Sequence, residues 1–191
     1  MPIEIELKAH IRDKDALGSK LSDRAEYLGA FEKIDTMWYT ADGSGFYPYG
    51  VRIRRETRVL PESAKKSKIF VTYKDKKIGD GIETNREEEF EVRSSSGRPE
   101  EIFENFLRRM GLIPGAGKRK QGKSYRIDGI TAELLEVDGL GWFIELEIIA
   151  DNDREDTLAS GKNKLFRFLD ELGVPKDAIE SRPYLQMLAE L

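Results

Sequence analysis

Alternation of apolar and charged residues opens the chain and recurs along it. Residues 3–8 read Ile-Glu-Ile-Glu-Leu-Lys, so one face of a strand is apolar and the other carries Glu4, Glu6 and Lys8. Four later segments repeat this two-residue period, and in each of them the charges on one face share a single sign. Those charged faces hold Arg52 and Arg54, then Lys74, then Glu87, Glu89 and Glu91, and finally Glu145 and Glu147.

Hydrophobic periodicity along the whole chain predicts about eight strands interrupted by helices. Gly111 and Gly173 are expected to end two of the helices, and 60–67 is expected to connect a hairpin. The expected strands are 2–9, 31–40, 50–58, 68–77, 86–93, 117–128, 130–138 and 141–150. The expected helices are 13–29, one from Pro99 to about Met110, 154–172, and a short one after Pro183.

Amphipathic helices and one-sided strands together indicate an inverted barrel. In an ordinary barrel the apolar faces point inward, but here the helices need an apolar surface on which to pack. We therefore expect an α+β fold, a closed or nearly closed antiparallel β-barrel with a charged tunnel and with the helices packed outside. Charged alternation on one strand alone is usually a solvated face, but five strands favour a lumen. The residues expected beneath the helices are Ile3, Ile5, Ile53, Ile144 and Leu146.

Composition narrows the possible functions. The 191 residues are expected to form one domain, 36% of them are charged, and the formal net charge of −4 disfavours nucleic acid as a partner. The absence of cysteine excludes disulfides and thiolate sites, and a single histidine, His10, argues against a His-rich zinc site. His10 is expected at the surface or as a cap. Without a signal core or a membrane span, we expect a cytoplasmic monomer or homodimer.

The charged faces also suggest a ligand. Basic side chains suit phosphate oxygens, and closely spaced carboxylates suit a hard divalent ion such as Mg²⁺ or Mn²⁺. The pattern therefore predicts a site for a metal ion and a polyphosphate. Phe46, Tyr47 and Tyr49 either stack on a base or thiazole ring or form a turn at the barrel rim.

Several motifs, in order along the chain, resemble those of the CYTH superfamily, the triphosphate tunnel metalloenzymes. Glu4-Ile-Glu6-Leu-Lys8 is similar to its Glu-x-Glu-x-Lys signature. That family includes class IV adenylyl cyclases, thiamine triphosphatases and inorganic triphosphatases. The other resembling segments are 35–39, 51–54, 71–74, 89–92, 139–147 and 181–188.

The resemblance implies roles for individual residues. It implies catalytic roles for Glu4, Glu6 and Lys8, with Glu89 and Tyr184 as possible additions. The residues implied to bind a triphosphate are Lys8, Arg52, Arg54, Lys74, Lys120 and Arg126. The residues implied to bind Mg²⁺ or Mn²⁺ are Glu4, Glu6, Glu133, Glu145 and Glu147.

Two positions depart from the family pattern. Gly122 stands where the family usually has arginine, and Lys118 or Arg126 has the strand parity to compensate. If the backbone accepts a side chain there, Gly122→Arg is expected to tighten triphosphate binding. Leu135 stands at a usually acidic position, and either Glu133 from a shifted place or Glu136 through a bulge would supply the carboxylate.

The resemblance implies chemistry on a small-molecule triphosphate and leaves the reaction open. Water as the nucleophile gives a triphosphatase, and a ribose 3′-hydroxyl attacking the α-phosphate gives a cyclase. We place hydrolysis first because it requires no base-positioning pocket. A non-catalytic polyphosphate or nucleotide sensor is the alternative that Gly122 and Leu135 suggest.

Overall fold

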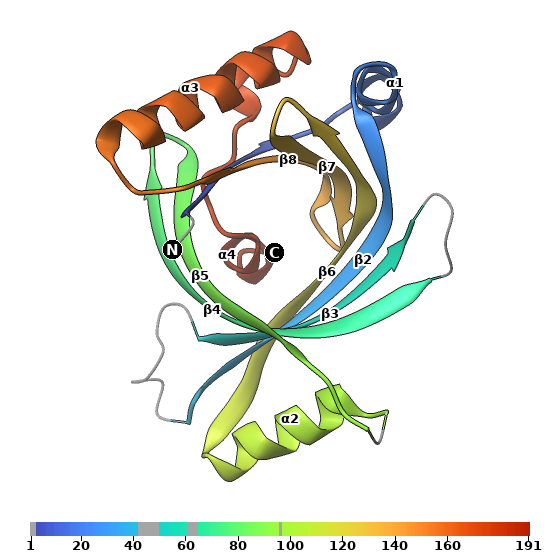
Figure 1. Ribbon diagram of the computed structural model, residues 1–191, viewed down its shortest axis with the longest axis vertical. Helices are drawn as coiled ribbons and strands as arrows, with labels where there is room; N and C mark the ends of the chain where they lie inside the picture. The colour runs from blue at the N-terminus through green and yellow to red at the C-terminus, as the bar shows by residue number, and fades with distance from the viewer. Residues whose placement is uncertain (1–2, 42–49, 61–64, 96) are drawn as a thin grey trace.

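The structure is a computed structural model that describes residues 3–41, 50–60, 65–95 and 97–191. Its strands form a closed barrel in the order β1-β5-β4-β3-β2-β6-β7-β8, and every neighbouring pair is antiparallel (Figure 1). The barrel and its strand directions were expected and are confirmed. The strands are β1 (Ile3–His10), β2 (Glu26–Thr40), β3 (Val51–Val59), β4 (Lys66–Gly79), β5 (Ile82–Val92), β6 (Leu112–Ile127), β7 (Ile130–Val137) and β8 (Gly141–Ala150).

Three helices lie outside the ring of strands in Figure 1, whereas α4 and the C-terminus lie within its outline. The helices are α1 (Lys14–Arg24), α2 (Pro99–Arg109), α3 (Glu155–Glu171) and α4 (Tyr184–Ala189), and a 3₁₀ turn covers Lys176–Ala178. None of the described helices combines the length and the apolar character that a helix crossing a bilayer requires.

The apolar faces of the strands point outward, under the helices. Ile5 and Leu146 are fully buried in a core that includes Leu21 of α1 and Leu165 of α3. Ile3 and Ile144 belong to the same core. Ile53 lies in a second core, with Leu107 of α2. Burial of these side chains is the main stabilising term of the fold, and it leaves the other face of each strand for the lumen.

A third apolar cluster lies on the inner side of the wall, against α4. Tyr184 and Met187 pack on Phe31, Leu135 and Phe143. Alternation along the strands places Phe31 on the face of Lys33, Leu135 on that of Glu133, and Phe143 on that of Glu145. The helix therefore covers one part of the lumen with apolar packing.

The boundaries of four elements differ from the prediction by four or more residues. The first helix ends at Arg24 instead of 29, because Ala25 is extended and β2 already pairs with β6 at Glu26. Backbone pairing with β6 outweighs the helical periodicity that predicts a helix up to residue 29. Strands β2, β5 and β6 begin five, four and five residues earlier than expected, at Glu26, Ile82 and Leu112, because neighbouring strands supply the hydrogen bonds.

Candidate triphosphate and metal site

The inner wall of the barrel is lined with charged residues of both signs. They come from all eight strands, because alternate residues of each strand turn inward. The inward cations are Lys8, Lys33, Arg52, Arg54, Lys74, Lys76, Lys118 and Lys120, and the inward carboxylates include Glu4, Glu6, Asp35, Glu83, Glu87, Glu89, Glu133, Glu145 and Glu147.

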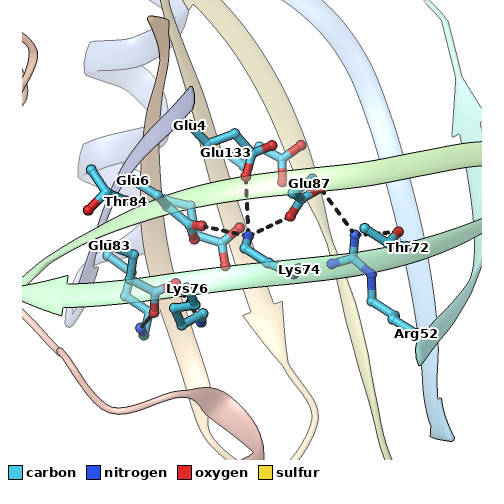
Figure 2. A network of polar contacts seen from close by, with 12 residues as sticks. Glu4, Glu6, Arg52, Thr72, Lys74, Lys76, Glu83, Thr84, Glu87 and Glu133 are labelled. Atoms are coloured by element: carbon cyan, nitrogen blue, oxygen red, sulfur yellow. Dashed lines mark hydrogen bonds and ion pairs between the residues drawn. The ribbon is translucent and has the colours of Figure 1, made fainter. Parts of the chain in front are cut away.

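Lys74 of β4 is surrounded by carboxylates from two other strands. Its Nζ lies 2.6 Å from Glu87, 3.2 Å from Glu4 and 3.8 Å from Glu6 (Figure 2). Burial alone would lower the pKa of Lys74, but these carboxylates raise it above its ordinary value. Lys74 is therefore a permanent cation, held where the predicted metal ligands and phosphate ligands meet.

Arg52 lies next to Lys74 and shares one of its partners. Its Nη2 donates a hydrogen bond of 2.9 Å to the Thr72 hydroxyl and lies 3.6 Å from Glu87 (Figure 2). It also lies 3.4 Å from Glu89. The guanidinium is thus oriented by the wall, and a planar guanidinium can bind two phosphate oxygens at once.

Arg54 forms a two-pronged ion pair with a buried carboxylate. Its Nε and Nη2 donate to the two oxygens of Asp35 at 2.7 and 2.9 Å, and Lys118 Nζ lies 3.0 Å from the same carboxylate. Burial would raise the pKa of Asp35, but the two cations hold it well below the usual range. Burial lowers the pKa of Lys118 to about 8, against the pull of Asp35. Two cations therefore share one carboxylate here, which leaves positive charge available for an anion.

Lys120 and Glu145 pair at 2.6 Å beside the ring of Tyr184. Burial would raise the pKa of Glu145, but Lys120 and Lys33 hold it at about 2. Lys8 Nζ also lies near the Tyr184 ring, 5.4 Å from its centre. Burial, followed by the charge of Glu145, raises the pKa of the Tyr184 phenol well above 10.0. Tyr184, expected only as a possible site residue, thus lies among the lumen charges as a neutral phenol.

Among the described carboxylates, Glu147 has the environment that most disfavours the ionised form. Its pKa is raised to about 8 by burial and then by the charges of Glu4, Glu6 and Glu133. The pKa of Glu4 is raised as well, again by burial first. Clustered carboxylates of this kind repel one another until a cation joins them.

This donor set fits a hard divalent cation, because it consists of carboxylate oxygens. In the described part of the chain, however, no three acidic or histidine side chains stand ready to enclose a metal ion. Lys74 holds Glu4 and Glu6, and Lys33 holds Glu133 through two contacts of 2.7 and 2.8 Å. Metal binding would require these carboxylates to exchange a lysine for the ion.

Some lumen residues were not expected from the sequence. Glu83 binds Lys8 at 3.0 Å and also contacts Lys76, and these two cations hold its pKa at about 2 despite burial. Glu83 lies before the expected start of its strand at 86. Lys33 was missed because its neighbours 32 and 34 do not form an apolar face, so the alternation is hidden.

The two departures from the family pattern are direct neighbours. Gly122 pairs with Phe31 on one side and with Leu135 on the other, and Leu135 pairs with Phe143. A Cβ at Gly122 would lie 2.2 Å from the carbonyl oxygen of Leu134. The backbone therefore does not accept a side chain, and the condition attached to Gly122→Arg is not met. An apolar row replaces charge at this level of the wall.

Of the four residues proposed to compensate for Gly122 and Leu135, two line the charged lumen and two do not. Lys118 and Glu133 face the lumen, as described above. Arg126 is exposed at the end of β6, away from the phosphate-site cations, and Glu136 lies on the outer face, where Gln121 contacts it at 3.4 Å. His10 is partly exposed, 3.3 Å from Glu180, in keeping with a surface position. Phe46, Tyr47 and Tyr49 lie outside the described residues.

The family model of the CYTH domain matches residues 2–184. The chain belongs to the CYTH domain family. A protein of Methanocaldococcus jannaschii named "Putative adenylate cyclase" is 31% identical over 188 residues, which cover 97% of this chain and 98% of that protein.

Solved structures show the same fold. A Pyrococcus horikoshii protein is 27% identical with a TM-score of 0.79, and the match covers 98% of each chain. A Hippeastrum protein, described as a "putative adenylyl cyclase" with a dominant triphosphatase activity, is 22% identical with a TM-score of 0.64. That match covers 95% of this chain and 91% of the Hippeastrum chain, and at this identity it shows the fold alone.

Proposed function

We propose that this CYTH protein binds a triphosphate in its lumen and hydrolyses it with the help of Mg²⁺ or Mn²⁺. The observation that carries the proposal is the cluster around Lys74, in which one ammonium contacts Glu4, Glu6 and Glu87. The charges of Glu4 and Glu6 also raise the pKa of nearby Glu147, so this cluster has more negative charge than Lys74 alone balances. On binding, phosphate oxygens would replace the carboxylates as partners of the cations, and a metal ion would bind the released carboxylates. A triphosphate with its metal ion would thus neutralise both the cations and the carboxylates of the lumen.

Each part of the wall would have its own task. Arg52, Arg54 and Lys74 would hold phosphate oxygens, with Lys8 and Lys120 alongside, and would stabilise charge that develops during transfer. Glu4, Glu6 and Glu147 would hold the metal ion, with Glu133 and Glu145 nearby. The ion, when bound, would neutralise phosphate charge and lower the pKa of a bound water.

A cyclase is the second candidate. Its supporting observation is the name of the Methanocaldococcus jannaschii relative, whose sequence matches nearly the whole chain. The same lumen would then align a ribose 3′-hydroxyl with the α-phosphate, so that a new P–O bond forms and pyrophosphate leaves.

One product panel separates these reactions. Purified protein would receive tripolyphosphate, ATP and thiamine triphosphate with Mg²⁺ or Mn²⁺, and phosphate, pyrophosphate and cyclic AMP would all be quantified. Phosphate release that Glu6→Gln abolishes is the expected result. Cyclic AMP with equal pyrophosphate would replace hydrolysis by cyclisation. Tight triphosphate binding without any product would indicate a sensor and refute the catalytic proposal.

A further inference from the structure

Phe70 of β4 is an aromatic side chain on the charged inner wall. It shares its strand face with Thr72 and Lys74, and it pairs across the strands with Arg54 and Glu91. Its outward neighbours Ile69 and Val71 are buried under α2, which fixes the direction of Phe70. Phe70 therefore lies directly beside the cations assigned above to the triphosphate.

The position of Phe70 differs from that of the aromatic residues near α4. Phe31, Phe143 and Tyr184 are buried in their apolar cluster. Phe70 is only partly buried, and the Lys68 ammonium, 5.8 Å from the centre of its ring, is its one described ring contact. Part of the Phe70 side chain is thus accessible to a further planar partner.

Exposure rises from the interior past Phe70 to the solvent. The Asp35 side chain is 1% exposed, Arg54 12%, Glu91 22% and Lys68 50%. Asp35 of β2, Arg54 of β3, Phe70 of β4 and Glu91 of β5 are cross-strand partners in this order. Lys68 is the next residue on the same face of β4 as Phe70. A triphosphate bound at Arg52, Arg54 and Lys74 would have an opening on this side for whatever group it carries.

We propose that Phe70 stacks on the aromatic ring of an organic triphosphate, and so makes this a site for a nucleotide-like substrate instead of inorganic tripolyphosphate. The inference rests on the proposed function and specifies its substrate class. Every nucleobase has a π face, and stacking on an aromatic side chain requires no particular hydrogen-bond pattern. The charged wall would fix the phosphates, and Phe70 would select for a ring beyond them.

Calorimetry on Phe70→Ala tests the inference directly. ATP, thiamine triphosphate and tripolyphosphate would be titrated in EDTA, which prevents turnover. Loss of stacking is expected to weaken binding of ATP or thiamine triphosphate by about five- to 150-fold. Tripolyphosphate affinity should stay within about twofold of wild type, and Phe70→Trp should retain the ring-bearing ligand. The ligand that responds identifies the ring.

Tyr73→Ala is the matched control, because Tyr73 lies on the outer face of the same strand and is 40% exposed. It should leave every affinity unchanged. Equal weakening of all three ligands in Phe70→Ala, or no weakening of any, would overturn the inference and leave triphosphate binding intact. Failure of wild type to prefer tripolyphosphate over monophosphate would instead overturn the proposed function on which the inference rests.

Discussion

Two bands of the same inner wall have opposite chemistry. In the band around Lys74, Arg52 and Arg54, ion pairs join neighbouring strands along the wall, whereas the row from Phe31 through Gly122 and Leu135 to Phe143 packs against α4. Strands β2 and β8 carry both kinds of inward residue, since two residues beyond Phe31 or Phe143 the inward side chain changes from aromatic to charged.

The comparison shows that the inward residues of one strand can contribute to a charged binding surface at one level and to apolar packing against α4 at the next. Inward residues of a strand are about 7 Å apart, so a single step moves from a packed surface to a charged one. The apolar band stabilises through burial and excludes water, which strengthens the electrostatic interactions of the charged band. Tyr184 lies at the border, with its ring in the apolar cluster and beside Lys8 and Lys120.

The largest expected effect of breaking the charged band is on turnover. Glu6→Gln and Glu147→Gln each remove a proposed metal ligand at constant volume, and should lower turnover by about 10²- to 10³-fold. Because the carboxylates repel one another without metal, neither variant should lose much stability in EDTA. Melting curves with and without Mn²⁺ measure this, and an undiminished Mn²⁺ stabilisation of both variants would refute the metal assignment.

Arg54→Ala should have the next largest effect, on affinity. Loss of a charge-assisted contact is worth roughly 1.5–3 kcal/mol, so tripolyphosphate should bind about ten- to a hundredfold more weakly. Arg54→Lys should recover part of this, since it keeps the charge but loses the two-pronged guanidinium. Calorimetry decides, with Arg93→Ala as the control because Arg93 is exposed and contacts only Glu91 among the described partners. An equal loss in Arg54→Ala and Arg93→Ala would contradict the assignment.

The apolar band can be broken at Gly122. A Cβ there meets backbone atoms of β7, so Gly122→Ala should destabilise the fold by about 1–3 kcal/mol. Gly79→Ala is the control, because no atom lies within 4 Å of the added Cβ. Urea unfolding measures both, and equal stability of the two variants would show that the close approach of β6 and β7 is unimportant.

The smallest effect is a pH dependence through Lys118. Its pKa, lowered to about 8 by burial, means that it is mostly charged at pH 7 and mostly neutral at pH 9. If it helps to bind an anion, raising the pH across this range should weaken tripolyphosphate binding by about two- to tenfold relative to Lys118→Gln. Parallel pH profiles of wild type and Lys118→Gln would exclude Lys118 from the site.

Strand alternation was enough to predict the barrel and the direction of Glu6, Arg52 and Glu147, because one clean apolar face fixes the parity of a strand. The pairing of Gly122 with Leu135 could not be predicted, since it depends on the register between β6 and β7. Ion pairs were hidden for the same reason: Lys33 and Glu133 are 100 residues apart in sequence. Sequence therefore indicated which residues face inward, and the structure shows which of them meet.

The most direct test of the central claim is the dependence of affinity on phosphate number. Wild-type protein would be titrated calorimetrically with orthophosphate, pyrophosphate and tripolyphosphate at one ionic strength. A lumen in which Arg52, Arg54 and Lys74 each hold phosphate oxygens predicts that tripolyphosphate binds more tightly than pyrophosphate, and pyrophosphate more tightly than orthophosphate. Equal affinity for orthophosphate and tripolyphosphate would contradict the account.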